Sequence, residues 1–136
     1  MNRLSQLREA GVSIWLDTLS RPLLETGEFA RLVREQAVTG ATSNPTIFAK
    51  AITGSDRYDD QLRAAVSSGT HSTQQLFFQL GLEDIRRAAQ VLRPICDASQ
   101  GADGFVSFEC TRIWPMTPTR RSPKHSSCGQ DWGCPM

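Results

Sequence analysis

Two acidic side chains and one amide occupy comparable places in this 136-residue sequence: Asp17, Asn44 and Glu109 each close a short apolar or β-branched run. Such a set can carry out acid–base chemistry on a hydroxylated substrate, because the amide donates to an oxygen while a carboxylate moves a proton. A single Asp or Asn at a strand end is more often a turn former or a helix N-cap. The three endings together favour a site.

Parallel strands would bring these residues to one edge of a sheet. The three runs predict strands at 12–16, 39–44 and 105–109. Helical periodicity elsewhere predicts helices at 2–10, 22–36, 45–52, 55–66 and 83–95. Gly27 is expected to divide the second helix, and Ser72 with Gln75 has the spacing of a capping box before a further helical run. Strands separated by helices predict an α/β fold with a parallel sheet, either open or part of a barrel.

The alternation of side chains along a strand fits the inside of a barrel mouth. Asn44 shares a face with Thr42, and Glu109 shares one with Ser107. In parallel α/β sheets the carboxyl ends of the strands line the ligand site. A complete (β/α)₈ barrel takes roughly 250 residues, so this chain is too short for one.

Charge and hydropathy exclude several classes of partner. Fifteen basic side chains face 14 acidic ones, for a formal net charge of +1, which leaves no broad basic surface for nucleic acid. No run approaches the roughly 20 apolar residues of a membrane span, and the first residues lack the apolar core of a signal peptide. We therefore predict a cytoplasmic protein without nucleic-acid or membrane partners.

The composition changes after residue 109, which divides the chain into a patterned part, 1–109, and a tail, 110–136. The tail holds three of the four cysteines and contains no Leu, Val, Ala or Phe, so no core face can be drawn there. We expect the tail to be irregular and disordered. A natural Pro-, Ser- and Arg-rich tail is one explanation. We favour a lost reading frame near Cys110, since 13 arginines against two lysines suggest GC-rich coding DNA.

The tail offers one rival site, a cluster that could in principle bind zinc. It consists of His125, Cys128 and Cys134, with Cys110 at a distance. The spacings H-x₂-C and C-x₅-C match none of the common paired C-x₂-C patterns. We therefore predict no metal site, and no disulfide in a cytoplasmic chain.

The segment GATSNPTIF at 40–48 resembles the transaldolase family, whose second barrel strand ends in a Thr-Ser-Asn-Pro-Thr stretch followed by apolar residues. The segments IWLD at 14–17, followed by Ser20-Arg21, and ADGFVS at 102–107, before Glu109, are similar to that family's first and third strands in the right order. The resemblance covers about residues 12–109 and stops at Cys110.

The resemblance implies the amino-terminal part of a (β/α)₈ TIM barrel, with about three strands and their helices. It also implies an enzyme of the pentose phosphate pathway that moves a dihydroxyacetone unit between sugar phosphates. Sedoheptulose 7-phosphate and glyceraldehyde 3-phosphate would give erythrose 4-phosphate and fructose 6-phosphate. The family's chemistry runs through a Schiff base on a lysine of the fourth strand and needs no metal or organic cofactor.

Site residues carry over by position. The resemblance implies that Asp17 acts on a substrate hydroxyl in carbon–carbon cleavage and that Glu109 works with a water in proton transfer. Asn44 would hydrogen-bond the bound intermediate, and its neighbours Thr42 and Ser43 belong to the same substrate-binding segment.

The chain departs from the family at the nucleophile. Its two lysines are Lys50, in a predicted helix, and Lys124, in the tail, and neither ends a predicted strand. The Schiff-base lysine is therefore absent, and we predict that the chain alone is inactive. One alternative is a non-catalytic sugar-phosphate-binding fragment or regulatory partner. Another is an unrelated small α/β module with a metal-binding tail. The oligomeric state is not readable from the sequence.

Overall fold

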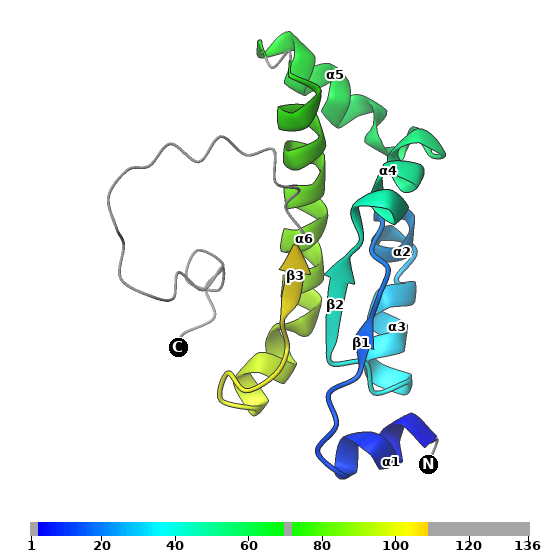
Figure 1. The fold of residues 1–136 in the computed structure, drawn as a ribbon, viewed down its shortest axis with the longest axis vertical. Coiled ribbons are helices and arrows are strands. Elements are labelled where there is room, and N and C mark those ends of the chain that lie inside the picture. Colours follow the sequence, from blue (N-terminus) through cyan, green and yellow to red (C-terminus); the bar gives the residue numbers. More distant parts are fainter. Residues whose placement is uncertain (1–2, 70–71, 109–136) are drawn as a thin grey trace, which may run out of the picture.

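The computed structural model describes residues 3–69 and 72–108 (Figure 1). Its elements, in chain order, are α1 (Arg3–Glu9), β1 (Trp15–Leu16), α2 (Arg21–Glu25), α3 (Glu28–Glu35), β2 (Gly40–Ser43), α4 (Pro45–Thr53), the 3₁₀ turn η1 (Asp56–Tyr58), α5 (Asp59–Ser67), α6 (Thr73–Ala98) and β3 (Val106–Phe108). The predictions made for Glu109 and for the tail, 110–136, lie outside the described residues.

The strands form a parallel sheet in the order β1-β2-β3. Trp15 pairs with Gly40 and Leu16 with Ala41, while Ala41, Thr42 and Ser43 pair with Val106, Ser107 and Phe108. Helices connect the strands, so the predicted α/β arrangement is confirmed. A three-stranded parallel sheet with its helices is consistent with part of an α/β barrel.

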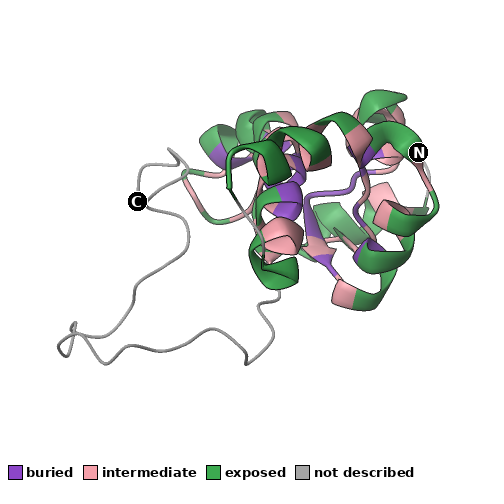
Figure 2. Cartoon of the chain, turned by 90° about the horizontal axis from the view of Figure 1, so that it is seen from above, coloured by how far each residue is buried: buried purple, intermediate pink, exposed green. Residues whose placement is uncertain are grey.

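Helices α2, α3 and α6 cover one face of the sheet (Figure 1). A core cluster joins Ala41 of β2 to residues from the loop after β1, from α3 and from α6: Leu19, Phe29, Ile85, Ala88 and Leu92. Half-buried Leu16, Val106 and Phe108 pack against the same cluster. Figure 2 shows the buried segments gathered in the interior between strands and helices. This apolar burial fixes which face of each strand turns inward.

A second cluster lies beyond the carboxyl ends of the strands, where α4, η1 and α5 meet the start of α6 (Figure 1). It is built on Phe48, Tyr58 and Leu80. The Phe48 ring packs edge-on against Tyr58, at a centroid distance of 6.0 Å, and against Phe77 at 5.3 Å. Such aromatic pairs add to the stabilisation that area burial alone provides.

Local chemistry explains most helix boundaries. Ser20 caps α2 and Asn44 caps α4, and each helix has a proline in its first turn. Gly27, at φ 77°, separates α2 from α3, as the sequence predicted. The capping-box prediction is wrong: Ser72 stands at the N-cap of α6, but its side chain makes no capping hydrogen bond. The packing of Phe77 and Leu80 into the second cluster holds the start of α6 instead.

The strands are shorter than predicted. The run at 12–16 yields a strand only at Trp15–Leu16. The Val12 amide instead donates to Leu7 O in α1 at 3.0 Å, and the Ile14 carbonyl accepts from both Thr39 N and Gly40 N, at 2.8 and 3.3 Å. This bifurcated contact begins the pairing irregularly. Within residues 3–69 and 72–108, no helix is both long and apolar enough to cross a membrane.

Candidate active site

Asp17 and Thr42 meet at the carboxyl edge of the sheet. Asp17 follows the last residue of β1, and continuing the β1–β2 register places it beside Thr42. The Thr42 hydroxyl Oγ1 donates to Asp17 Oδ1 at 2.5 Å. The Asp17 side chain is exposed, Thr42 is half-buried, and this is the one hydrogen bond of the Asp17 carboxylate within the described residues. The carboxylate is therefore oriented by the protein and still open to a ligand.

Asn44 serves as the N-cap of α4. Its Oδ1 accepts from Thr46 N at 2.9 Å and from Ile47 N at 3.4 Å. Asn44 therefore does cap a helix, which is the structural role that a strand-terminal Asn often has. The cap occupies the oxygen alone, and the Nδ2 amide makes no hydrogen bond to any part of the chain that the structure describes. A half-buried donor group at this edge is available to a substrate oxygen.

Ser43 lies on the opposite face of β2. It is 2% exposed and, like Ala41, faces the helices, because side chains alternate along the strand. The structure therefore brings Thr42 into contact with Asp17, places Asn44 at the end of the same strand, and turns Ser43 to the opposite face. Its predicted place in substrate binding stays a prediction, and such a role would have to act through the backbone.

The open face of the sheet has two rows of side chains. The register aligns Asp17, Thr42 and Ser107 in a polar row. The row beneath it contains Trp15, Gly40 and Phe105, of which Trp15 is 40% exposed and Phe105 38%. Gly40 accommodates the indole, since a Cβ there would lie 2.5 Å from the Trp15 ring. The exposed aromatic side chains of Trp15 and Phe105 thus border the polar row on its amino-terminal side.

Two components of the predicted chemistry remain, Glu109 and a lysine nucleophile. Glu109 directly follows β3 in the chain but lies outside the described residues. Lys50 is exposed in the last turn of α4 and ends no strand. The structure thus agrees with the sequence that Lys50 is a helix residue.

A second polar cluster, which sequence reasoning missed, is buried behind the β1–α2 loop. The Arg21 guanidinium donates through Nε to Asp84 Oδ1 at 2.8 Å, and the Tyr58 hydroxyl donates to Asp84 Oδ2 at 2.8 Å. Arg21 is 4% exposed, Tyr58 1% and Asp84 0%. One sequence feature could have indicated this cluster: Asp84 is a charged residue in the apolar stripe of α6, four residues after Leu80 and four before Ala88.

Burial dominates the electrostatics of this cluster. Removal from water raises the pKa of the Asp84 carboxyl above its ordinary value, while the hydrogen bonds from Arg21 and Tyr58 oppose that rise. Burial also raises the pKa of the Tyr58 hydroxyl, which therefore stays protonated and serves as a donor. The Tyr58 hydroxyl and the Arg21 guanidinium therefore remain hydrogen-bond donors to Asp84.

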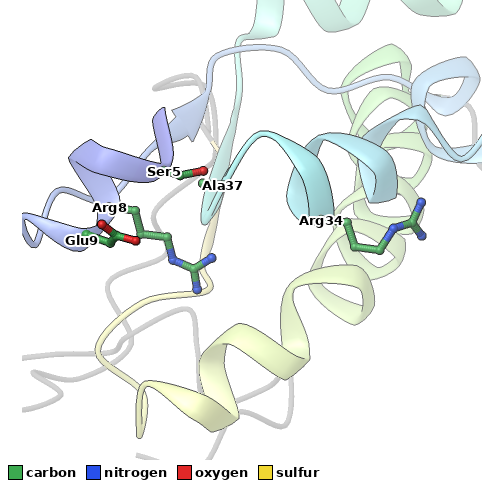
Figure 3. A pocket seen from close by; sticks show the side chains of 5 residues that line it. All are labelled: Ser5, Arg8, Glu9, Arg34 and Ala37. Atoms are coloured by element: carbon green, nitrogen blue, oxygen red, sulfur yellow. The ribbon is translucent and has the colours of Figure 1, made fainter. Parts of the chain in front are cut away.

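A pocket opens at the other end of the sheet, near the amino ends of the strands (Figure 3). Its lining comes from α1, from α3 and from the segment before β2: Ser5, Arg8, Glu9, Arg34 and Ala37. The Arg34 side chain points away from Ser5 and Arg8 in Figure 3. This pocket contains none of the predicted site residues. No group of three or more potential metal ligands occurs in residues 3–69 and 72–108.

Comparison with known proteins finds both a family profile and similar individual proteins. The family profile described as Transaldolase/Fructose-6-phosphate aldolase matches residues 14–113. Transaldolase of Acidothermus cellulolyticus is 50% identical over 106 residues, and transaldolase of Thermobifida fusca is 48% identical over 106; each alignment covers 78% of this chain and 28% of the relative. Transaldolase 2 of a Nostoc species is 43% identical over 109 residues, or 80% of this chain and 28% of the relative.

The matches cover most of this chain but only a small part of each relative. The chain spans less than a third of the length of these relatives, with 28% of each covered. The family profile, in contrast, covers more than half of this chain and includes β1, β2, β3 and their polar ends. The chain therefore belongs to the transaldolase/fructose-6-phosphate aldolase family.

Proposed function

We propose that this chain carries the first three strands of a transaldolase site, which transfers a dihydroxyacetone unit between sugar phosphates. The observation that supports the proposal most is the meeting of Asp17, Thr42 and Asn44 at one edge of a parallel sheet, in a chain of this family. The reaction converts sedoheptulose 7-phosphate and glyceraldehyde 3-phosphate into erythrose 4-phosphate and fructose 6-phosphate.

Asp17 is the proton-moving group in the proposed reaction. Cleavage of the carbon–carbon bond requires removal of a proton from the neighbouring substrate hydroxyl as that carbon becomes a carbonyl. The exposed Asp17 carboxylate has one oxygen held by Thr42, which leaves the other for that proton. Thr42 orients the carboxylate, and this arrangement suits general base catalysis.

Asn44 binds the substrate in the same proposal. Its Nδ2 amide can donate to a substrate oxygen without disturbing the helix cap, since the cap uses Oδ1. Thr42 lies between the two groups in the sheet edge, and Ser43 contributes through the strand that carries them. Glu109 works with a water in proton transfer.

The nucleophile belongs to a strand beyond these three. A Schiff base requires a desolvated amine of lowered pKa, and Lys50 is exposed on α4. We therefore propose that the 136-residue chain alone does not turn over substrate. The reaction belongs to the pentose phosphate pathway in the cytoplasm, with no metal or organic cofactor and no nucleic-acid or membrane partner.

A second candidate function is a non-catalytic sugar-phosphate-binding fragment. It is favoured by the same geometry, because the Asp17 carboxylate and the Asn44 amide are available to a ligand while Lys50 is not at the edge. Binding without turnover would be expected from this candidate.

Titration of the isotope-labelled chain with fructose 6-phosphate tests the site. Backbone and side-chain NMR signals of Asp17, Thr42 and Asn44 should shift, and the Asn44→Asp variant, which keeps a capping oxygen but loses the amide donor, should bind more weakly. Arg34→Gln, beside the pocket at the other end, should bind as the unaltered chain does. Shifts confined to that pocket, or none at saturation, would overturn the proposed site.

Borohydride treatment in the presence of fructose 6-phosphate tests whether the nucleophile lies outside these three strands. A Schiff base would be trapped as a covalent adduct detectable by mass spectrometry. We expect no adduct and no turnover for this chain. An adduct on Lys50 would contradict the assignment of the nucleophile to another strand.

A further inference from the structure

We propose that the buried cluster of Arg21, Tyr58 and Asp84 is a positioning device that holds the Asp17 carboxylate against Thr42. The inference rests on the proton-moving role proposed for Asp17, and it gives Asp84 a part in that site. None of the three buried residues reaches the open edge, so each acts through the β1–α2 loop.

The cluster holds the start of α2 through hydrogen bonds of both the backbone and the side chain of Arg21. The Arg21 backbone N–H donates to the Tyr58 hydroxyl at 2.8 Å, and that hydroxyl donates its own hydrogen bond to Asp84. The Arg21 guanidinium bonds Asp84 through Nε and donates to the carbonyl oxygens of Arg57 and Leu80, at 3.4 and 3.3 Å. It also lies 4.4 Å from the centre of the Tyr58 ring.

The bonds join segments that are far apart in the chain. Arg21 opens α2, Tyr58 closes η1, and Asp84 lies in α6. Each hydrogen bond therefore fixes the loop after β1 to an element that follows β2, independently of the β1–β2 pairing. A shift of α2 would break several buried charge-assisted bonds at once.

The short link to Asp17 makes the anchor effective. Three residues separate Asp17 from Arg21, and the central one, Leu19, is 1% exposed in the main core cluster. Ser20 caps α2 by accepting from Leu23 N at 3.4 Å. The loop is thus held at its middle and at its end, and the register of β1 holds its beginning.

The chemistry of the anchor also favours a positioning role over simple stabilisation. A buried ion pair stabilises a fold little more than apolar residues of similar volume would, because both charges lose their hydration. Its directional bonds instead select one geometry. Here the selected geometry places the loop so that Asp17 Oδ1 lies within hydrogen-bond distance of Thr42.

The test compares Asp84→Asn with Ile85→Val in the full 136-residue chain, without ligand. Asp84→Asn keeps the shape but removes the charge that holds Arg21. Ile85→Val removes one methyl from the adjacent buried residue of the same helix and leaves the cluster intact. The readout is hydrogen exchange of the Thr42 hydroxyl, followed by the deuterium isotope shift on its Cβ.

We expect Asp84→Asn to speed exchange of the Thr42 hydroxyl about tenfold or more, the factor for loss of one hydrogen bond to a charged group. Ile85→Val should lower the midpoint of urea unfolding without that change. Unaltered exchange in folded Asp84→Asn would overturn the proposal, as would equal acceleration in Ile85→Val. Because no sugar is present, these outcomes are independent of whether the edge binds a sugar phosphate.

Tyr58→Phe and the unaltered chain keep the proposal testable if Asp84→Asn does not fold. Tyr58→Phe retains the ring and the ion pair but removes the acceptor of the Arg21 amide, and it should speed Thr42 exchange. In the unaltered chain, the Arg21 amide and the Thr42 hydroxyl should open with the same dependence on urea. A Thr42 hydroxyl that opens while the Arg21 amide stays protected would contradict coupling between the two.

Discussion

Two polar clusters lie on either side of the β1–α2 loop, and they are built in opposite ways. The cluster of Arg21, Tyr58 and Asp84 is buried, and its charged groups are surrounded by hydrogen-bond partners from three elements. Asp17 and Asn44 lie at the open edge, each with a part of its side chain held by protein and a part left for solvent. The difference separates groups that fix geometry from groups that can meet a ligand.

Truncating Asp84 should produce the largest effect. Asp84→Ala leaves the Arg21 charge buried without its partner, which should lower the free energy of unfolding by about 3–5 kcal/mol. Such a loss is comparable to the whole stability of a small domain. Asp17→Ala, at the exposed edge, should change it by only about 0.5 kcal/mol or less. Urea unfolding monitored by circular dichroism checks both, and similar losses in the two variants would erase the distinction between the clusters.

Gly40→Ala should have the next largest effect, on the open face. The new Cβ would lie 2.5 Å from the Trp15 ring, so the indole has to move, at a cost of about 1–3 kcal/mol. Combining it with Trp15→Ala should recover the overpacking part of that loss, and urea unfolding of the single and double variants measures it. Equal stability of Gly40→Ala and the unaltered chain would mean that the Trp15 ring does not pack over Gly40.

Asn44 allows its two roles to be separated. Asn44→Ala should lower the free energy of unfolding by about 1 kcal/mol through loss of the α4 cap. Asn44→Asp should keep that stability, since a carboxylate caps a helix as well as an amide does. Thermal unfolding compares the two variants. A full loss in Asn44→Asp would show that the amide nitrogen, rather than Oδ1, matters to the fold.

The smallest effect concerns pH, which should act on the buried and exposed carboxyls with opposite sign. Burial raises the pKa of Asp84 above 3.8, so the folded state binds its proton more readily, and its stability contribution declines as pH rises through the raised value. A hydrogen bond from Arg57, opposed by burial and supported by a weaker hydrogen bond from Arg87, lowers the pKa of Glu25 below 4.5. Its stability contribution is therefore lost as pH falls through the lowered value.

Unfolding curves at about pH 3–6 measure these contributions in the unaltered chain, Asp84→Asn and Glu25→Gln. Asp84→Asn should remove the decline on the alkaline side. Glu25→Gln should remove a loss on the acidic side, and it should be the weaker of the two because its ion pairs with Arg57 and Arg87 are solvent-accessible. Identical pH profiles in all three proteins would contradict both assignments.

The sequence predicted those parts of the fold that depend on local pattern. Short apolar runs closed by polar residues predicted the parallel sheet, and Gly27 marked the break between α2 and α3. The pattern also marked Asn44 as a residue that ends a strand and can cap the next helix. These features follow from side-chain alternation and from helix caps, which a single sequence contains.

Local sequence pattern could not predict the contacts between segments that are far apart in the chain. Arg21 meets Tyr58 and Asp84 across 37 and 63 residues of sequence, and no local pattern pairs them. The position of Trp15 over Gly40 depends on the register of two strands. Likewise, Asn44 could be recognised as a cap or as a ligand, but only the geometry showed that its oxygen caps α4 while its amide has no partner in the described residues.

A chimera tests whether this chain's sheet edge can serve a transaldolase. Residues 14–109 would replace the matching segment of the Acidothermus cellulolyticus transaldolase, a relative 50% identical over 106 residues. We predict that the chimera transfers the dihydroxyacetone unit, that Asp17→Asn lowers its kcat about 10²–10⁴-fold, and that Glu35→Gln on the surface of α3 has no effect. A folded chimera without activity, or one unaffected by Asp17→Asn, would contradict this role of the sheet edge.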